Sequence, residues 1–268
     1  MTDVDLDALA EAYEAGLAAE KAGDLEAAAG AYARALALDP EDRGGVAIRL
    51  AALGLAPDPE TAPPAYVATL FDQTAERFDD ILVEQLGYAV PLMLRDLLER
   101  HGVPRAGRLL DLGCGTGLAG DSLRERADHV TGVDLSEGML DIAHDRGSYD
   151  ELYVGEAVAF LDGWDEAPFD LIAATDMLPY LGPVEGLFRT AAAALVPGGH
   201  LAVSTEALAD GEGPGWAVGR LQRYAHAPGY IAAALEVAEF DLLAAEPITV
   251  RYNEGRPIPG QLVLARRR

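Results

Sequence analysis

From Arg108 onward, short apolar runs alternate with helical segments, and this alternation is the feature that most restricts the fold. Buried strands are indicated by RLLDLG, HVTGVDLS, FDLIAATD and HLAVSTE, with ELYVGEA as a weaker candidate. Strands that alternate with helices form a parallel sheet covered on both faces. The last two strand candidates, FDLLAAEPITVR and GQLVLAR, are separated only by Tyr252–Gly260. We therefore expect these two to pair antiparallel in an otherwise parallel α/β sheet.

A glycine-rich loop follows the first of these strands. Gly113, Gly115 and Gly117 lie between the strand and a helical segment, within LLDLGCGTG. Glycine permits a tight turn and lets a ligand approach the backbone closely, and the helix behind the loop presents free N–H groups. A dinucleotide fingerprint would place its third glycine where this chain has Leu118. The loop thus predicts a nucleoside-type ligand that is not a dinucleotide.

Two acidic residues narrow the choice of ligand. Asp111 lies two residues before the first glycine, where a carboxylate repels a pyrophosphate and suits a cation. Asp134 ends the next strand, at a place where an acid typically accepts hydrogen bonds from both ribose hydroxyls. The expected ligand is a nucleoside that carries an ammonium or sulfonium group and no pyrophosphate. S-adenosylmethionine has that description.

Four motifs in order, DLGCGTG, GVDLS, FDLIAATDML and LVPGGHLAVSTE, resemble those of class I S-adenosylmethionine-dependent methyltransferases over about residues 65–268. The resemblance implies a doubly wound, Rossmann-like, seven-stranded sheet with an antiparallel last strand. It implies S-adenosyl-L-methionine as the cofactor and S-adenosyl-L-homocysteine as the product. The implied cofactor-binding residues, from the methionine end through the ribose to the adenine, are Asp176, Asp111, Gly113, Cys114, Gly115, Gly117, Asp134, Leu135, Met139, Glu156 and Ala157. MLPYLG lacks the Asn-Pro-Pro-Tyr-type signature of amino-directed DNA methyltransferases.

The N-terminal region carries a different pattern. Residues 6–38 have helical periodicity that is broken at Gly23-Asp24, which predicts an αα-hairpin. Small residues and one aromatic residue stand where two helices would cross closely: Gly16, Ala28, Tyr32 and Ala35. This spacing resembles one tetratricopeptide (TPR) repeat, and the whole chain resembles the predicted bacterial TPR-repeat methyltransferases. The hairpin is either a module that docks a partner protein or a helical cap packed on the main domain.

We expect the chain to divide into three parts. Residues 1–56 form the TPR-like hairpin, residues 57–105 form a linker with amphipathic lid or cap helices, and residues 106–268 form the cofactor-binding domain. Four prolines exclude a helix in PDPETAPP, residues 57–64. The aromatic residues of the second part either fold over the sulfonium through cation–π contacts or bury their helix against the sheet. They are Tyr66, Phe71, Phe78 and Tyr88.

The segment after HLAVSTE is the expected acceptor site, because it lies at the carboxyl edge of the sheet, where ligands bind. It gathers basic and aromatic residues in an acidic chain: Arg220, Arg223, Tyr224, His226 and Tyr230. His226 is the predicted general base, since an unperturbed imidazole titrates near pH ~6.5. Arg223 can clamp a substrate carboxylate with two hydrogen bonds, and Tyr224 completes the candidate catalytic set. The alternative is a solvated helix start in which Arg223 pairs with a neighbouring acid.

The charge and composition of the chain argue against several classes of function. With 45 acidic and 20 basic residues the net charge is −25, which argues against binding to nucleic acids or anionic membranes. Cys114 is the single cysteine, so it excludes a disulfide framework, and a small contact residue is favoured over a nucleophile. No histidines stand at metal-ligand spacing, so no metal is expected. The absence of a signal peptide or an apolar span indicates a cytoplasmic protein.

The predicted function is direct in-line transfer of a methyl group to a hydroxyl or carboxylate oxygen of a small-molecule acceptor. This choice follows from the lack of a basic surface, of an amino-directed motif and of a well-placed cysteine. One alternative is a protein methyltransferase that uses the hairpin for docking, and another is a non-catalytic cofactor-binding protein. A nicotinamide-dependent oxidoreductase is the third, and Leu118 and Asp111 argue against it.

Overall fold

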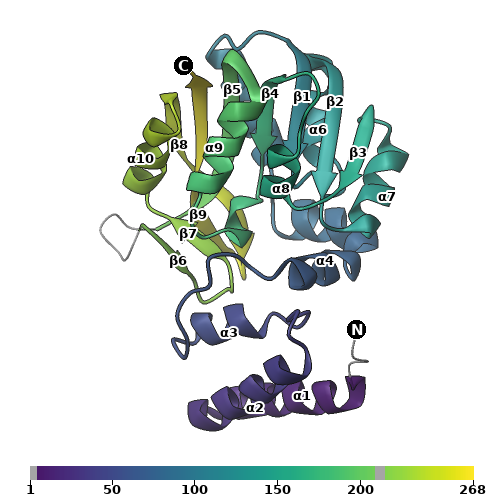
Figure 1. Cartoon of the computed structure of the whole chain (residues 1–268), viewed down its shortest axis with the longest axis vertical. Coiled ribbons are helices and arrows are strands. Elements are labelled where there is room, and N and C mark those ends of the chain that lie inside the picture. Colours follow the sequence, from purple (N-terminus) through teal and green to yellow (C-terminus); the bar gives the residue numbers. More distant parts are fainter. Residues whose placement is uncertain (1–4, 209–214) are drawn as a thin grey trace.

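A mixed β-sheet forms the centre of this computed structural model, which describes residues 5–208 and 215–268 (Figure 1). Seven strands follow the order β3-β2-β1-β4-β5-β9-β8. Their bounds are β1 (Ala106–Leu112), β2 (Ala127–Asp134), β3 (Glu151–Val154), β4 (Phe169–Ala174), β5 (Leu195–Ala207), β8 (Phe240–Asn253) and β9 (Arg256–Arg267). Strands β1 to β5 are parallel, and β9 pairs antiparallel with both β5 and β8. The predicted α/β sheet with an antiparallel last strand is confirmed.

Both faces of the sheet are buried, because alternate residues of each strand point to opposite faces. In β1, Leu110 and Leu112 belong to one apolar core and Leu109 belongs to the other. Helices α8 (Ala157–Asp162), α9 (Glu185–Ala194) and α10 (Pro228–Val237) contribute to the first core. Helices α5 (Val90–Arg100) and α6 (Leu118–Leu123) contribute to the second, and α7 (Glu137–Arg146) packs beside the lid. A 3₁₀ turn (Arg124–Arg126) links α6 to β2.

The segment that holds the predicted catalytic set forms a β-hairpin. Strands β6 (Trp216–Val218) and β7 (Tyr224–His226) pair antiparallel, and β7 extends the sheet beyond the end of β5. The interpretation of this segment as a solvated helix start was wrong. Tyr224 and His226 are two residues apart, so in a strand their side chains lie on the same face, and both are buried. Residues 209–214 of the predicted acceptor segment lie outside the described residues.

The last two strands are longer than the sequence suggested. Strand β8 turns into β9 through Glu254-Gly255 alone, whereas a separation of Tyr252–Gly260 was expected. Gly255 has a φ of 74°, which lets the chain reverse tightly. The two strands therefore pair antiparallel as predicted, over a greater length.

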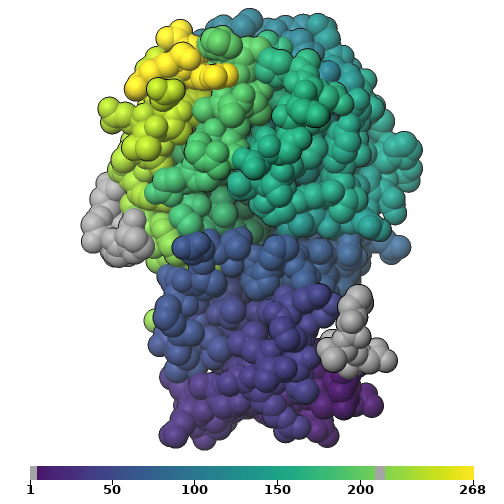
Figure 2. Space-filling view, viewed as in Figure 1, coloured from purple at the N-terminus to yellow at the C-terminus, as the bar shows by residue number. Residues whose placement is uncertain are grey.

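Three helices form the N-terminal part: α1 (Leu6–Ala22), α2 (Leu25–Leu38) and α3 (Val46–Ala52). The predicted hairpin of α1 and α2 is confirmed, and Gly23, with a φ of 78°, makes the turn. The Tyr32 ring fills the space over Gly16, where an added Cβ would lie 2.3 Å from it. The similarity to a TPR repeat stays a prediction. Figure 2 shows these helices stacked against the lid segment that follows them.

A lid connects the N-terminal helices to the sheet. Residues 57–63 are not helical, as predicted, and they precede α4 (Pro64–Asp72), a 3₁₀ turn (Ala75–Arg77) and a π-helical segment (Asp80–Gln85). The amphipathic helices expected within residues 57–105 are therefore interrupted in this segment. Just after α4, the hydroxyl of Thr74 donates back to the carbonyl oxygen of Leu70 at 3.1 Å. None of the helices in the described part of the chain is long and apolar enough to span a membrane.

Candidate active site

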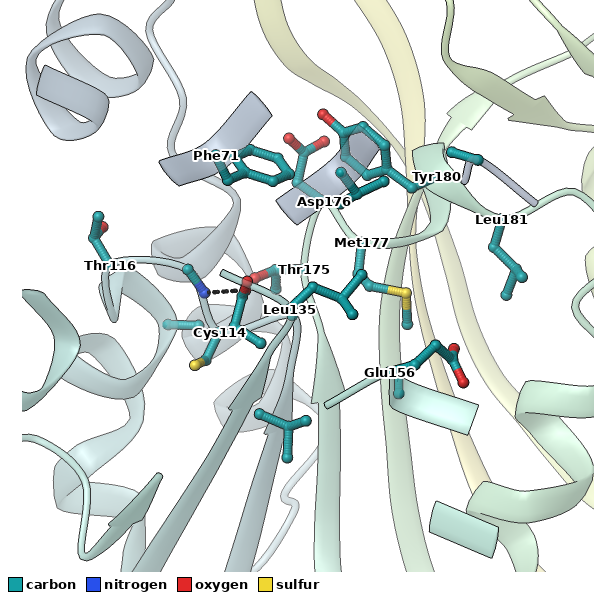
Figure 3. Close-up of a pocket in the computed structure, with 18 of the residues that line it drawn as sticks. Phe71, Cys114, Thr116, Leu135, Glu156, Thr175, Asp176, Met177, Tyr180 and Leu181 are labelled. Atoms are coloured by element: carbon teal, nitrogen blue, oxygen red, sulfur yellow. Dashed lines mark hydrogen bonds between the residues drawn. The ribbon is translucent and has the colours of Figure 1, made fainter. Parts of the chain in front are cut away.

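A cavity of about 1040 Å³, including its open mouth, lies between the lid and the carboxyl ends of the central parallel strands (Figure 3). Its walls come from the glycine loop, the ends of β2 and β4, the start of α8, the lid and the 3₁₀ turn η4 (Leu178–Tyr180). The charged residues that line it are all acidic: Asp134, Glu156 and Asp176. Because no lysine, arginine or histidine of the described chain lines it, the cavity favours neutral or cationic ligands.

The glycine loop forms one wall of the cavity as predicted. The backbone N–H groups of Gly113 and Cys114 both donate to the carbonyl oxygen of Val133, at 2.8 and 3.0 Å. Gly113 has a φ of 67°, and a Cβ added there would lie 2.8 Å from Cγ of Met177. Glycine is thus required for both the turn and the contact. Gly117 does not line the cavity; it lies behind the loop and begins α6.

Asp134 lies at the end of β2 and lines the cavity, as predicted. Its Oδ2 accepts from the backbone N–H of Gly115 at 2.8 Å, and its Oδ1 accepts from that of Ser136 at 2.9 Å. Burial raises the pKa of this carboxyl, and the backbone donors oppose that effect. Each carboxylate oxygen can accept more than one hydrogen bond. The carboxylate therefore joins two loops and can still accept hydrogen bonds from ligand hydroxyls.

Asp111 does not lie where a ligand could reach it. It is fully buried behind the glycine loop, where Oδ2 accepts from the Tyr149 hydroxyl at 2.7 Å. Oδ1 has no partner within the described residues, and burial raises the pKa of the carboxyl to about 7. The prediction of direct cofactor contact is not supported. Sequence analysis missed Tyr149, although Gly120 and Gly132, which leave room for its ring, were the available signal.

Of the residues predicted to contact the adenine, some line the cavity and others do not. Leu135 and Ala157 line the cavity, whereas Met139 is fully buried beneath it. Glu156 lines the cavity, but its carboxylate caps α8 by accepting from the N–H groups of Val158 and Ala159, at 3.0 and 2.7 Å. Both carboxylate oxygens are thus engaged by the backbone.

His226 was wrongly predicted as the general base. It is fully buried and does not line the cavity. Its Nε2 lies 2.9 Å from the carbonyl oxygen of Gly182, so Nε2 carries the proton, and its ring stacks on Tyr230 at 6.2 Å between centroids. Burial lowers the pKa of the imidazole. The side chain fastens β7 to the loop after η4 and cannot reach an acceptor in the cavity.

The other two predicted catalytic residues are also internal. Tyr224 is fully buried away from the cavity, and its hydroxyl donates to the carbonyl oxygen of Pro59 at 2.8 Å. Arg223 donates from Nε to Glu206, from Nη2 to Asp176 and from Nη1 to the Tyr180 hydroxyl, each at 2.6 Å. Pairing with acids, the alternative interpretation, therefore holds for Arg223. The prediction that it clamps a substrate carboxylate is wrong, because each of its nitrogen atoms has a partner within the protein.

A buried ionic quartet, consisting of Asp176, Glu206, Arg223 and Arg251, lies at one end of the cavity. Arg251 Nη2 donates to Glu206 Oε1 at 2.7 Å, and Arg251 Nη1 lies 3.5 Å from Asp176 Oδ1. Only Asp176 of the four lines the cavity. Glu206 and Arg251 were not predicted, and the one signal was the acidic Glu206 within HLAVSTE, a strand expected to be buried. The partners come from distant strands that only the tertiary fold brings together.

The aromatic residues of the lid are split between two roles. Phe71, Phe78 and Tyr88 line the cavity, whereas Tyr66 packs against Gly45 of the N-terminal part. Phe71 contacts Phe78 edge to face, with ring centroids 5.7 Å apart. It makes a similar contact with Tyr180 at 5.4 Å. These rings form the apolar roof of the cavity.

Two aspartates that sequence analysis missed hold the lid in place. Asp72 accepts from the Ser136 hydroxyl at 2.5 Å and from a backbone N–H at the start of α7. Asp79 accepts from the Thr116 hydroxyl at 2.5 Å and pairs with Arg146. The lid is thereby fixed to both loops that Asp134 joins.

The single cysteine lines the cavity but is not poised as a nucleophile. Cys114 is buried, and burial raises the pKa of its thiol well above the usual value. A protonated thiol is a weak nucleophile, so the interpretation as a small contact residue fits its surroundings. Within residues 5–208 and 215–268, no group of three His, Cys, Asp or Glu side chains is arranged to hold a metal ion.

Comparison with known proteins agrees with this geometry. The family described as "Methyltransferase domain" matches residues 84–238. A ubiquinone biosynthesis O-methyltransferase of Xylella fastidiosa is 36% identical over 107 residues, which are 38% of this chain and 44% of that protein. One of Marinobacter nauticus is 34% identical over 121 residues, 43% of this chain and 50% of that protein. The match thus spans about half of the length of these curated relatives.

Solved structures show the same fold at low identity. The N-methyltransferase NodS from Bradyrhizobium japonicum, solved with S-adenosyl-L-homocysteine, has a TM-score of 0.58 and 16% identity. That similarity covers 75% of this chain and 98% of NodS. The [4+2]-cyclase SpnF has a TM-score of 0.59 and 19% identity, over 75% of this chain and 94% of SpnF. Proteins with different reactions thus share the fold, so the reaction has to be argued from the site.

Proposed function

The chain belongs to the methyltransferase domain family, and from this premise we propose that it transfers the methyl group of S-adenosylmethionine to an oxygen of a small-molecule acceptor. The observation that carries the proposal is the cavity itself. It joins a glycine loop and a ribose-type carboxylate to a largely apolar chamber that no basic residue of the described chain lines. The curated relatives are named as O-methyltransferases, which supports an oxygen acceptor.

The adenosine part of the cofactor is assigned to the end of the cavity that holds Asp134. The carboxylate of Asp134 accepts hydrogen bonds from the ribose hydroxyls, and Leu135 and Ala157 flank the adenine. The backbone of Gly113 to Gly115 approaches the methionine part. Asp111 supports the glycine loop from behind through Tyr149, and Glu156 supports the adenine end by capping α8.

The bound cofactor supplies an already activated methyl group on a sulfonium. The protein has to orient the acceptor and exclude water, and positioning of this kind contributes up to about 7–11 kcal/mol in favourable cases. Phe71 and Phe78 close the roof of the chamber. Their faces also attract a sulfonium, by about 0.5–2 kcal/mol each.

Calorimetric titration of the whole chain with S-adenosylmethionine and with NAD tests the cofactor assignment. We expect binding of the methyl donor and no binding of NAD, because the charged side chains that a pyrophosphate would meet among the described cavity residues are all carboxylates. A screen with labelled methyl donor then tests the acceptor class, with label expected in small hydroxylated compounds. NAD binding without any response to the methyl donor would refute the proposal, and label recovered only in protein would move it to a protein acceptor.

A protein partner at the N-terminal hairpin stays a prediction. Ile48 of α3 is fully buried in one cluster with Val67 and Tyr224, and Val67 lines the cavity. Deletion of residues 1–56 would therefore disturb the lid as well as any docking surface. A surface substitution such as Leu25→Glu, at an exposed position of α2, separates the two effects: a docking role predicts lost turnover of a protein acceptor with unchanged cofactor binding.

A further inference from the structure

We propose that Asp176 binds the hydroxyl group of the acceptor and takes its proton during methyl transfer. This inference rests on the proposed function and names both the acceptor class and the residue that recognises it. The acceptor is an apolar molecule with a neutral hydroxyl group. A carboxylate acceptor is not expected, because no basic side chain of the described residues lines the cavity to pair with it.

The three carboxylates that line the cavity differ in the hydrogen bonds that they accept from the protein. In Asp134 and Glu156, both carboxylate oxygens accept hydrogen bonds from backbone N–H groups. In Asp176, Oδ1 is held by the arginines of the quartet, whereas no hydrogen bond within the described residues engages Oδ2. Among the three, Asp176 is thus the carboxylate with one oxygen that accepts no hydrogen bond within the described protein.

Asp176 also lies at the end of the cavity where an acceptor is expected. Figure 3 shows Asp176 beside Phe71 and Tyr180 at one end of the cavity, with Glu156 at the other end. Asp176 directly follows the end of β4, and its neighbour Met177 packs on Gly113 of the glycine loop. If the adenosine lies between Asp134 and Glu156, Asp176 is on the side where an acceptor meets the methyl group.

The backbone of Asp176 is fixed as well as its side chain. Its φ is 57°, in the left-handed region that aspartate adopts more readily than most residues other than glycine. Its backbone N–H is fixed by the Ser204 hydroxyl at 2.8 Å. Arg223 and Arg251 are positioning residues, since they orient the carboxylate without lining the cavity.

Tyr180 provides a second polar group beside Asp176. Its hydroxyl oxygen accepts from Arg223, so its hydrogen remains available to donate into the cavity that the residue lines. Burial is the largest influence that raises the pKa of this phenol to about 12, so it remains protonated. An acceptor hydroxyl can therefore donate to Asp176 and accept from Tyr180.

Methyl transfer to the acceptor is coupled to the loss of the hydroxyl proton. A lone pair of the acceptor oxygen forms the new O–CH₃ bond while the S–CH₃ bond breaks, and the electron pair of that bond stays on sulfur. The proton of the acceptor hydroxyl moves to Oδ2 of Asp176. The products are the methyl ether, S-adenosylhomocysteine and a protonated carboxyl, which returns its proton to water.

The test uses two probe compounds of the same shape, 4-butylphenol and 4-butylbenzoate, titrated calorimetrically into the full chain saturated with S-adenosylhomocysteine. At about pH 8 the phenol is neutral and the benzoate is ionised. We expect the wild type to bind the phenol about tenfold to 100-fold more tightly. In Asp176→Asn, phenol binding weakens by about tenfold or more and the preference over benzoate falls to near unity.

Glu206→Gln is the matched control, because it removes one negative charge from the same two arginines without removing a cavity atom. We expect it to keep most of the preference for the phenol. Equal affinity of the wild type for both probes, no binding of either, or equal effects of the two substitutions would overturn the inference. The comparison of the two probes in the wild type can overturn the inference even if a variant fails to fold. A wild type that binds no S-adenosylhomocysteine would instead refute the proposed function, and the two failures are thereby distinguished.

Discussion

The two ends of the cavity hold their carboxylates by different means. At the cofactor end, Asp134 and Glu156 are held by backbone N–H groups, mostly of residues two or three positions away. At the acceptor end, Asp176 is held by two arginine side chains, one just before β7 and one in β8, 47 and 75 positions further along the chain. Carboxylates bound by a local backbone belong to short sequence motifs, whereas a network of side chains is assembled only by the tertiary fold.

The same difference decides which parts of the molecule could be predicted. Strand and helix periodicity and the turn glycines are local signals, so the mostly parallel sheet with its antiparallel last strand, the glycine loop and the location of Asp134 followed from the sequence. His226 and Tyr224 have side chains suited to catalysis, but the pairing of β7 with β5 turns both into the interior. Asp111 occupies the expected position in its motif, yet its side chain points behind the loop, toward Tyr149.

The largest expected effect is at the acceptor end. Arg223→Met leaves Asp176 and Glu206 buried with only Arg251 to balance them, and breaking a buried ion pair in this way costs about 3–5 kcal/mol. We expect a loss of that size in the free energy of unfolding, measured with urea. Arg220→Met, at an exposed position of the same hairpin, should change it by less than about 0.5 kcal/mol. Equal values for the two variants would show that the quartet does not stabilise the acceptor end.

The next effect is at the cofactor end. Asp134→Ala removes the proposed ribose acceptor and the bonds to Gly115 and Ser136. We expect the affinity for S-adenosylmethionine to fall by about 100-fold, since hydrogen bonds to a charged group contribute about 1.5–3 kcal/mol each. Calorimetric titration measures this affinity. The control is Asp128→Ala, at the exposed start of the same strand. An unchanged affinity would remove the ribose assignment.

A smaller effect concerns the carboxylate behind the glycine loop. The pKa of Asp111 is about 7 in the folded protein, against 3.8 for an unperturbed aspartate. A raised pKa means that the contribution of this group to stability is complete below the unfolded value and is lost as pH rises through 7. Between about pH 6 and 8 the wild type should therefore lose about 1.4 kcal/mol of unfolding free energy through this group.

Asp111→Asn should lose that dependence and keep the hydrogen bond from Tyr149. Urea unfolding of the cofactor-free protein at both pH values measures the difference. Asp128→Asn, at an exposed position, should follow the wild type. If Asp111→Asn retains the full decrease between the two pH values, the carboxyl is ionised in the folded protein, and the cavity carries one more negative charge at its base.

The smallest effect on ligand affinity is expected at His226, which was predicted from the sequence to be the general base. His226→Gln can keep a donor to Gly182, so the affinity for S-adenosylmethionine should change by less than about twofold. The pKa of the imidazole is lowered by burial. Its contribution to stability is therefore complete above the unfolded value of about 6.5 and is lost as the pH falls below it. Urea unfolding between about pH 7 and 5 should show a smaller decrease for His226→Gln than for the wild type, and the exposed His144→Gln should follow the wild type. A folded His226→Gln protein that binds the cofactor but transfers no labelled methyl group would return this histidine to the reaction, and the acceptor end would then extend beyond the residues that line the cavity.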